Sequence, residues 1–210
     1  MTPLDPRLYL VLDPVHGPAD PLAVVHAAVE GGVTAVQVRA PAATGRALFD
    51  ATRAVVAALA GTGVAVIVDD RLDVALAAGA DGVHLGRHDV PPAQARRIAG
   101  SGLSIGWSVT GPGDLRAADP AVVDLLGIGP VFATATKPDA APATGLDGLR
   151  TLADGARALG VPSVAIGGID AGNAGDVLAA GVDGLAVSSA IAAAPDPGAA
   201  ARALRAAPLG

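Results

Sequence analysis

Carboxylate side chains collect after two neighbouring apolar runs of this chain. Asp69 and Asp70 follow the run at 64–69, and Asp89 lies shortly after the run at 82–85. Carboxylates at the ends of adjacent strands can converge on one hard cation, and Mg²⁺ is commonly held by one or two carboxylates together with phosphate oxygens. The spacing therefore predicts a Mg²⁺ site at Asp70 and Asp89, with Asp69 either joining it or pointing away. The alternative is that Asp70 only caps the helix that follows it.

A second cluster of polar groups lies in GPVFATATKPD, residues 129–139. Thr134, Thr136 and Lys137 set two hydroxyls and an ammonium side by side directly after an apolar run. These groups can donate hydrogen bonds to phosphate oxygens, and Arg39 at the end of an earlier apolar run can bind the same anion. The alternative is a solvated loop, because KPDAAPATG is rich in turn-forming residues.

Two later segments have the character of anion sites built from backbone N–H groups. They are IGGI at 166–169 and VSSAI at 187–191, and each follows a short apolar run. Glycine lets the backbone come close to a phosphate, and a helix N-terminus adds a favourable dipole. A tight turn is the alternative for the Gly-Gly pair. Its position near small serines favours phosphate binding.

These side chains need a scaffold that brings the ends of many strands together. Alanine-rich helical stretches alternate with apolar runs at 8–13, 35–39, 64–69, 82–85, 104–108, 125–129, 163–166 and 185–188. Eight βα units favour a closed (β/α)₈ TIM barrel, whose chemistry sits at the C-terminal ends of the strands, where the polar clusters fall. A doubly wound open sheet is the alternative. Because no linker or charge block is visible, one domain over residues 1–210 is expected.

Three segments resemble one another, at 30–39, 77–86 and 179–188. Each is predicted to contain the end of a helix at a glycine in the left-handed conformation, a short turn and the start of a strand. His84 in the second segment is expected to point into the top of the barrel and hold its neighbours. No Ser-His-Asp arrangement or paired general acid and base is recognisable, so the site is expected to have little covalent machinery.

Composition excludes several classes of protein. The net charge is −6 with no long basic run, which argues against a nucleic-acid partner. The chain has no cysteine, which excludes disulfides and thiolate metal sites and fits a reducing compartment. Its apolar stretches are too short for a membrane helix, and its first residues lack the order of a signal peptide. A cytoplasmic protein without a membrane partner is therefore predicted.

Several motifs closely resemble the thiamine-phosphate synthase family. They run in order along nearly the whole chain: VQVR with Gln37 and Arg39, VDDRLDVALAAGADGVHLGRHD at 68–89, GWSVT at 106–110, GPVFATATKPDAAPATGLDGL at 129–149 and VAIGGI at 164–169. The block at 129–149 is the most specific of them. The resemblance implies a TIM-barrel transferase that uses Mg²⁺ to join hydroxymethylpyrimidine pyrophosphate to thiazole phosphate, or its carboxylated form, with release of pyrophosphate.

The resemblance also implies roles for individual residues. Asp70 and Asp89 would hold Mg²⁺. The residues implied to bind the pyrimidine pyrophosphate are Gln37, Arg39, Asp69, Ser108 and Lys137. Those implied to bind the thiazole phosphate are Thr134, Thr136, Gly168, Ser188 and Ser189. In the dissociative mechanism of the family, Arg39 and Lys137 would be catalytic because they take up the charge of the departing pyrophosphate.

The chain departs from the family pattern at three positions. Pro41 stands where a lysine is usual, Asp69 where an asparagine is usual, and Arg87 where a glutamine is usual. Our hypothesis is that Arg87 replaces some of the lost positive charge. The substitutions at 41 and 69 raise the question of whether activity is impaired.

Three alternative functions remain at this point. One is a thiazole tautomerase, whose catalytic histidine would fall at Thr110. Another is a non-catalytic paralogue that binds a thiamine precursor, and a third is a different barrel enzyme acting on a sugar phosphate. The oligomeric state is open, with a homodimer allowed, and one of the loops at 13–20 and 137–145 is expected to cover the site.

Overall fold

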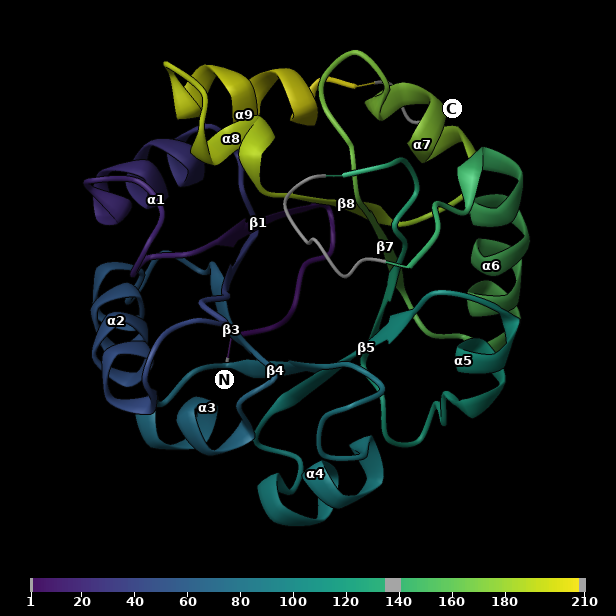
Figure 1. The fold of residues 1–210 in the computed structure, drawn as a ribbon, viewed down its shortest axis with the longest axis horizontal. Helices are drawn as coiled ribbons and strands as arrows, with labels where there is room; N and C mark the ends of the chain where they lie inside the picture. The colour runs from purple at the N-terminus through teal and green to yellow at the C-terminus, as the bar shows by residue number, and fades with distance from the viewer. Residues whose placement is uncertain (1, 135–140, 208–210) are drawn as a thin grey trace.

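Eight short runs of branched apolar residues form the strands of a closed parallel barrel, with helices around it (Figure 1). The computed structural model describes residues 2–134 and 141–207. The strands are β1 (Leu8–Leu12), β2 (Ala35–Val38), β3 (Ala65–Asp69), β4 (Gly82–Leu85), β5 (Ser104–Val109), β6 (Leu125–Ile128), β7 (Ser163–Ile166) and β8 (Gly184–Val187). Each pairs in parallel with its neighbours in sequence, and β1 pairs with β8. The predicted TIM barrel is confirmed, and the open sheet is wrong.

The helices form the outer layer, with one helix after each of β1 to β7 and two after β8 (Figure 1). They are α1 (Pro21–Glu30), α2 (Gly45–Ala58), α3 (Leu72–Ala78), α4 (Pro92–Ala99), α5 (Pro112–Ala117), α6 (Gly145–Leu159), α7 (Ala174–Ala179), α8 (Ser189–Ala192) and α9 (Pro197–Arg205). The last helix packs beside the first, α9 against α1, next to the pairing of β1 with β8. Within the described part of the chain, no helix is long and apolar enough to cross a membrane.

Side chains alternate along each strand between the barrel interior and the helix layer, as the two-residue period of a strand requires. The interior cluster is small: Tyr9, Val11, Ala35, Ala65, Ile67, Leu125, Val164 and Ala186, with Leu4 and Ile166 packed against it. A larger cluster fills the space between strands and helices. Both layers are built almost entirely from Ala, Val, Leu and Ile, which explains why the chain needs so few aromatic residues.

The segment before β1 covers the N-terminal end of the barrel. Leu4 packs against the interior cluster, and the backbone N–H of Thr2 donates to the Asp81 carboxylate at 2.6 Å. At the other end of the strands the inward positions become polar, with Gln37, His84 and Ser108 among them. The strand ends that the sequence predicted to carry chemistry therefore lie at the end opposite Leu4.

One hydrogen-bond pattern recurs at the start of every second strand. The residue just before the strand makes two hydrogen bonds with one residue of the preceding strand. Its side-chain oxygen accepts from the backbone N–H of that residue, and its backbone N–H donates to the carbonyl of the same residue. The four residues that do this are Thr34, Asp81, Asp124 and Asp183. Three of them lie in the similar segments noted in the sequence, so the similarity has a structural cause.

The predicted glycine caps were right at one helix and displaced at two. Gly79 ends α3 in the left-handed conformation, with φ 71°. The helix α1 ends on Gly31 in the right-handed conformation, and it is Gly32 that has a positive φ of 104°. In the same way α7 ends on Ala180, and the positive φ of 96° is at Gly181. In both cases the chain reverses one residue after the helix cap.

Candidate active site

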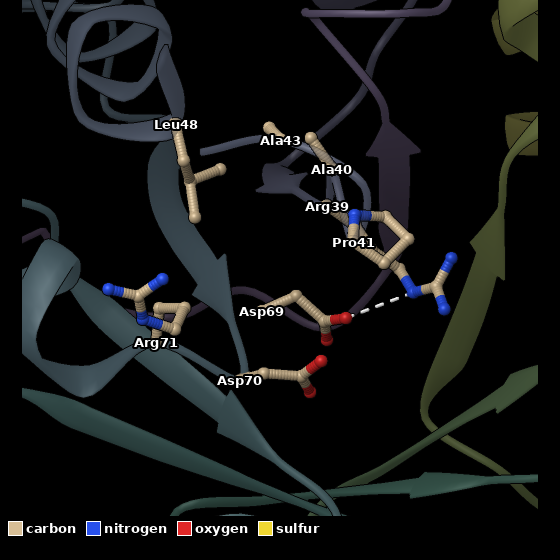
Figure 2. Close-up of a pocket in the computed structure, with 8 residues that line it drawn as sticks. All are labelled: Arg39, Ala40, Pro41, Ala43, Leu48, Asp69, Asp70 and Arg71. Carbon is tan, nitrogen blue, oxygen red and sulfur yellow. Dashed lines mark ion pairs between the residues drawn. The ribbon is translucent and has the colours of Figure 1, made fainter. Parts of the chain in front are cut away.

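The end of β3 carries two consecutive carboxylates in unusual geometry. Asp70 has a φ of 62°, and its backbone N–H donates to the His84 carbonyl at 2.8 Å. A positive φ is uncommon outside glycine and, where it occurs, is a reason to look for function. Figure 2 shows the Asp69 and Asp70 carboxylates pointing to the same side, whereas Arg71 points away from them. Arg71 is the N-cap of α3, so the alternative in which Asp70 caps that helix is wrong.

Asp70 and Asp89 meet although they come from different strands. Burial, the negative charges of Asp69 and Asp89, and a hydrogen bond to Asp89 together raise the pKa of Asp70 to about 7. Asp89 is held in a turn, where its carboxylate accepts from the Gly86 N–H at 2.7 Å and its own N–H donates to the Gly86 carbonyl at 3.1 Å. Two carboxylates in contact need a proton or a cation between them.

Asp69 contacts two residues of the neighbouring strand end. Its Oδ1 accepts from Gln37 Nε2 at 2.5 Å, and its Oδ2 pairs with Arg39 Nε at 2.9 Å. The Arg39 and Asp69 side chains are only 22% and 11% exposed, so solvent screens this pair weakly. Figure 2 shows the rest of the Arg39 guanidinium extending past Asp69. Asp69 thus holds Arg39 at Nε, and the two Nη groups of Arg39 extend beyond the Asp69 carboxylate.

A pocket opens beside these charges (Figure 2). Its lining residues are Arg39, Ala40, Pro41, Ala43, Leu48, Asp69, Asp70 and Arg71. One wall is charged, and the other consists of small apolar side chains. Pro41, at the position where the family resemblance leads one to expect lysine, belongs to the apolar wall and adds no charge to the pocket.

The loop after β6 is fastened to the loop after β7. The backbone N–H groups of Val131 and Phe132 donate to the carbonyls of Ile166 and Gly167, at 2.9 and 3.0 Å. Gly168 has a φ of 66°, and a Cβ there would lie 2.7 Å from Phe132 Cβ. Glycine is therefore required by both its conformation and the close approach of the two loops.

Thr134 lies two residues beyond this contact and is partly buried. The residue just before α6 is also tied to the start of the loop after β6, since the Thr144 N–H donates to the Pro130 carbonyl at 2.8 Å. Thr136 and Lys137 lie outside the described residues. Ser188 and Ser189 stand at the start of α8, with Ser188 partly buried and Ser189 exposed.

Two residues have contacts that sequence reasoning did not assign. His84 Nε2 lies 2.9 Å from Ser108 Oγ, which links the ends of β4 and β5. Arg87 pairs with Asp114 at 2.9 Å and donates to Thr110 Oγ1 at 3.2 Å. The Arg87 charge is thus already matched by a carboxylate of α5, which weakens our hypothesis that it replaces a missing positive charge. The inward position of His84 could be read from strand alternation, but neither partner could.

A family model and several curated relatives similar to this chain point to thiamine-phosphate synthases. A family model described as thiamine monophosphate synthase matches residues 8–191. The thiamine-phosphate synthase of Albidiferax ferrireducens is 50% identical over 175 residues, covering 83% of this chain and 78% of the relative. That of Laribacter hongkongensis is 50% identical over 179 residues, covering 84% and 83%. The solved thiamine phosphate pyrophosphorylase of Pyrococcus furiosus superposes with a TM-score of 0.85 at 39% identity, covering 96% of this chain and 95% of that one.

Proposed function

Because this chain belongs to the thiamine monophosphate synthase family, we propose that its barrel joins hydroxymethylpyrimidine pyrophosphate to thiazole phosphate and releases pyrophosphate. Its activity is thiamine-phosphate synthesis, which makes it a transferase acting on small molecules. The observation that carries the proposal for this site is the contact of Asp70 with Asp89 beside an arginine whose Nη groups are directed past Asp69. This is an arrangement suited to a metal-bound pyrophosphate.

The residues at the strand ends fit Mg²⁺. Asp70 and Asp89 are in hydrogen-bonding contact, and the pKa of Asp70 is raised to about 7 by burial and by nearby negative charge, so a cation between them would relieve their repulsion. Among the described residues, no three His, Asp or Glu side chains are grouped to hold a metal by themselves. Mg²⁺ typically takes only one or two carboxylates and completes its shell with water and phosphate oxygens. When bound here, it would neutralise charge on the leaving pyrophosphate.

The pyrophosphate half of the proposal assigns roles to charged and polar donors. Arg39 is held at Nε by Asp69, so its Nη groups remain to donate to two phosphate oxygens. Ser108 adds a hydroxyl, and Gln37 lies next to Asp69, positioned to contact the pyrimidine part of the same substrate. Lys137 is the only lysine of the chain, so with Pro41 at the family's lysine position it is the only ammonium side chain that can act there. We assign it to the leaving group.

Asp69 acts in this proposal through its neighbours. Its Oδ1 accepts a hydrogen bond from Gln37 and its Oδ2 pairs with Arg39, so it orients both residues around the pyrimidine pyrophosphate. An asparagine has only one side-chain oxygen to accept with, whereas a carboxylate has two. The acidic residue at this position therefore suits a role in holding Arg39 and does not by itself indicate lost activity.

The thiazole phosphate would bind on the other side of the barrel mouth. Gly168 lies in the loop after β7, where barrels of this kind often bind phosphate, and Thr134 follows the segment fastened to that loop. Ser188 and Ser189 would add hydroxyls from the start of α8 and Thr136 another from the same loop as Thr134. In this proposal the two substrates bind their phosphate groups on different sides of the barrel mouth.

The chemistry follows from this distribution of charge. The bond between the pyrimidine methylene and pyrophosphate breaks first, and the thiazole nitrogen then attacks the resulting cation. Arg39 and Lys137 stabilise the negative charge that develops on the leaving group, a role that donors directed at developing charge commonly fill. No protein nucleophile is needed.

We also propose that residues 1–210 form one domain acting in the cytoplasm. The pairing of β1 with β8 and the packing of α9 on α1 join the two ends of the described chain in one barrel. The lack of cysteine fits a reducing compartment. A homodimer is compatible with the proposal, which does not depend on it.

One assay tests the proposed function. The purified protein is mixed with both substrates, with Mg²⁺ or with EDTA, and thiamine phosphate and pyrophosphate are measured together. Equal amounts of both products, only with Mg²⁺, are expected. Asp89→Asn should abolish this activity, while Asp73→Asn, an exposed aspartate of α3, should keep it. Substrate binding without product would favour a non-catalytic paralogue, and tautomerisation of carboxythiazole phosphate without coupling would favour a tautomerase.

A further inference from the structure

We propose that His84 is a positioning residue that sets the direction in which the Ser108 hydroxyl donates its proton. The proposal rests on the proposed function in one respect, namely that Ser108 faces the pyrophosphate. It assigns His84 no contact with the substrate. Its action is on the hydroxyl that touches the substrate.

The imidazole is held deep in the barrel mouth. His84 is only 9% exposed, and its Nε2 lies 2.9 Å from Ser108 Oγ on the neighbouring strand. In the strand register His84 is opposite Gly106, and Ser108 is opposite Gly127 on the next strand. The ring therefore crosses from β4 over β5 towards β6.

Two glycines provide the space that this ring occupies. A Cβ on Gly106 would lie 2.4 Å from His84 Nδ1, and a Cβ on Gly127 would lie 2.9 Å from His84 Cε1. Both distances are shorter than carbon contacts normally allow, so any side chain at 106 or 127 would displace the ring. Gly106, Gly127 and His84 therefore act together. The glycines fix the position of the imidazole ring, and the ring sets the direction of the Ser108 hydroxyl.

The direction of the hydrogen bond follows from the ligand. Pyrophosphate oxygens only accept hydrogen bonds, and a serine hydroxyl has a single proton to donate. If that proton pointed at the imidazole, Ser108 would turn its lone pairs towards an anion. Ser108 can donate to pyrophosphate only if Oγ accepts from His84, so Nε2 must carry a proton.

The first test measures that proton directly. Long-range ¹H–¹⁵N spectra of the ¹⁵N-labelled protein distinguish a protonated from an unprotonated Nε2, with His84→Gln used to assign the signal. A protonated Nε2 is expected in the free protein and with Mg²⁺ and pyrophosphate bound. An unprotonated Nε2 in the pyrophosphate complex would overturn the proposal.

The second test asks whether the two residues act as a unit. His84→Ala and Ser108→Ala should each lower kcat by roughly 10- to 100-fold, the range for losing a hydrogen bond to a charged group, with a smaller change in KM. The double variant should lose little more than either single one. His84→Gln, which places an amide nitrogen near the Nε2 position, should recover most of the rate. Losses that multiply in the double variant, or no recovery with Gln, would contradict a positioning role.

The third test adds a methyl group at Gly106, next to the ring, and at a control glycine. Gly106→Ala should lower kcat about as much as His84→Ala, because it displaces the ring. In the His84→Ala background, Gly106→Ala should cost nothing further, since the clashing ring is absent. Gly113→Ala, which meets no atom within 4 Å, is the control for adding a methyl group. Equal costs of Gly106→Ala in both backgrounds would refute the proposed unit.

These outcomes separate two failures. If the wild-type protein forms no thiamine phosphate from both substrates, the proposed function has failed. The spectra of His84 with Mg²⁺ and pyrophosphate need no turnover, so they still decide whether Nε2 donates to Ser108. Unchanged thermal unfolding of the His84→Ala and Gly106→Ala variants shows that a lost rate does not come from lost folding.

Discussion

Replacing Asp70 by asparagine is expected to stabilise the metal-free protein above neutral pH, although it removes a proposed Mg²⁺ ligand. The pKa of Asp70 is raised from 3.8 to about 7 by burial and by the charges of Asp69 and Asp89. Between these two values the folded protein holds a proton that the unfolded chain has released. The free energy of unfolding therefore falls as the pH rises from about 4 to about 7, and this loss is complete above pH 7.

The size of the effect is set by the shift and by solvent. The full shift corresponds to about 4 kcal/mol at 1.36 kcal/mol per pKa unit. Asp70 is solvent-exposed on one side, and screening reduces such interactions strongly, so we expect about 1–2 kcal/mol. Asparagine tolerates the φ of 62° at this position, so the substitution adds no backbone strain.

Urea unfolding at pH 5 and pH 8 in EDTA measures this effect. At pH 8 the Asp70→Asn protein should be about 1–2 kcal/mol more stable than the wild type, and at pH 5 the gain should shrink. Adding Mg²⁺ at ten times its Kd should stabilise the wild type by about 1.4 kcal/mol and leave the variant unchanged.

Asp73→Asn is the control, and its effect on the free energy of unfolding should have the opposite sign. A hydrogen bond from Arg71 holds the pKa of Asp73 below its usual value, so losing this carboxylate should weaken the protein slightly at both pH values. If Asp70→Asn were neutral or destabilising at pH 8 in EDTA, the inference that Asp70 is repelled by Asp69 and by Asp89 would be wrong.

Three further predictions concern single side chains. Lys137→Ala should lower kcat by at least about 100-fold, because it removes a donor to the leaving group, and Lys137→Arg should recover part of the rate; a near-wild-type rate for Ala would contradict the assignment. Arg87→Ala should leave the affinity for the pyrimidine pyrophosphate unchanged and cost at most about 1 kcal/mol in urea unfolding, since Arg87 pairs with Asp114 at an exposed site; a tenfold loss of affinity would restore the compensation hypothesis. Asp183→Ala should cost about 1–3 kcal/mol of stability by leaving the Ser163 N–H unpaired, without changing turnover per folded molecule, whereas the exposed Asp176→Ala should change neither.

The strands and their order were predictable from local sequence. The run predicted at 64–69 is the strand Ala65–Asp69, and the run predicted at 185–188 is the strand Gly184–Val187. Branched apolar residues bounded by glycine and aspartate mark a buried strand with little dependence on distant residues. At α1 and α7 the left-handed glycines, Gly32 and Gly181, lie one residue beyond the helix caps Gly31 and Ala180, because the exact end of a helix is less well marked in the sequence than its interior.

The site was predictable in composition and not in contacts. Strand alternation and motif resemblance bring Asp69, Asp70 and His84 to the same end of the barrel. They do not say that Asp69 holds Arg39 at 2.9 Å or that Arg87 turns to Asp114. Those partners lie 30 and 27 residues away in the sequence, so their pairing depends on which strands and helices become neighbours.

The sequence by itself determined the parallel barrel, the end of it that carries polar groups and the family to which the chain belongs. Local patterns suffice for these, because apolar periodicity and short motifs act within a few residues. Only the tertiary structure decided what each polar group does: Asp70 meets Asp89, Asp69 orients Arg39, and His84 reaches Ser108 across two glycines. The reason is that hydrogen bonds and charge pairs require contact within a few ångströms, and closing the barrel is what creates that contact.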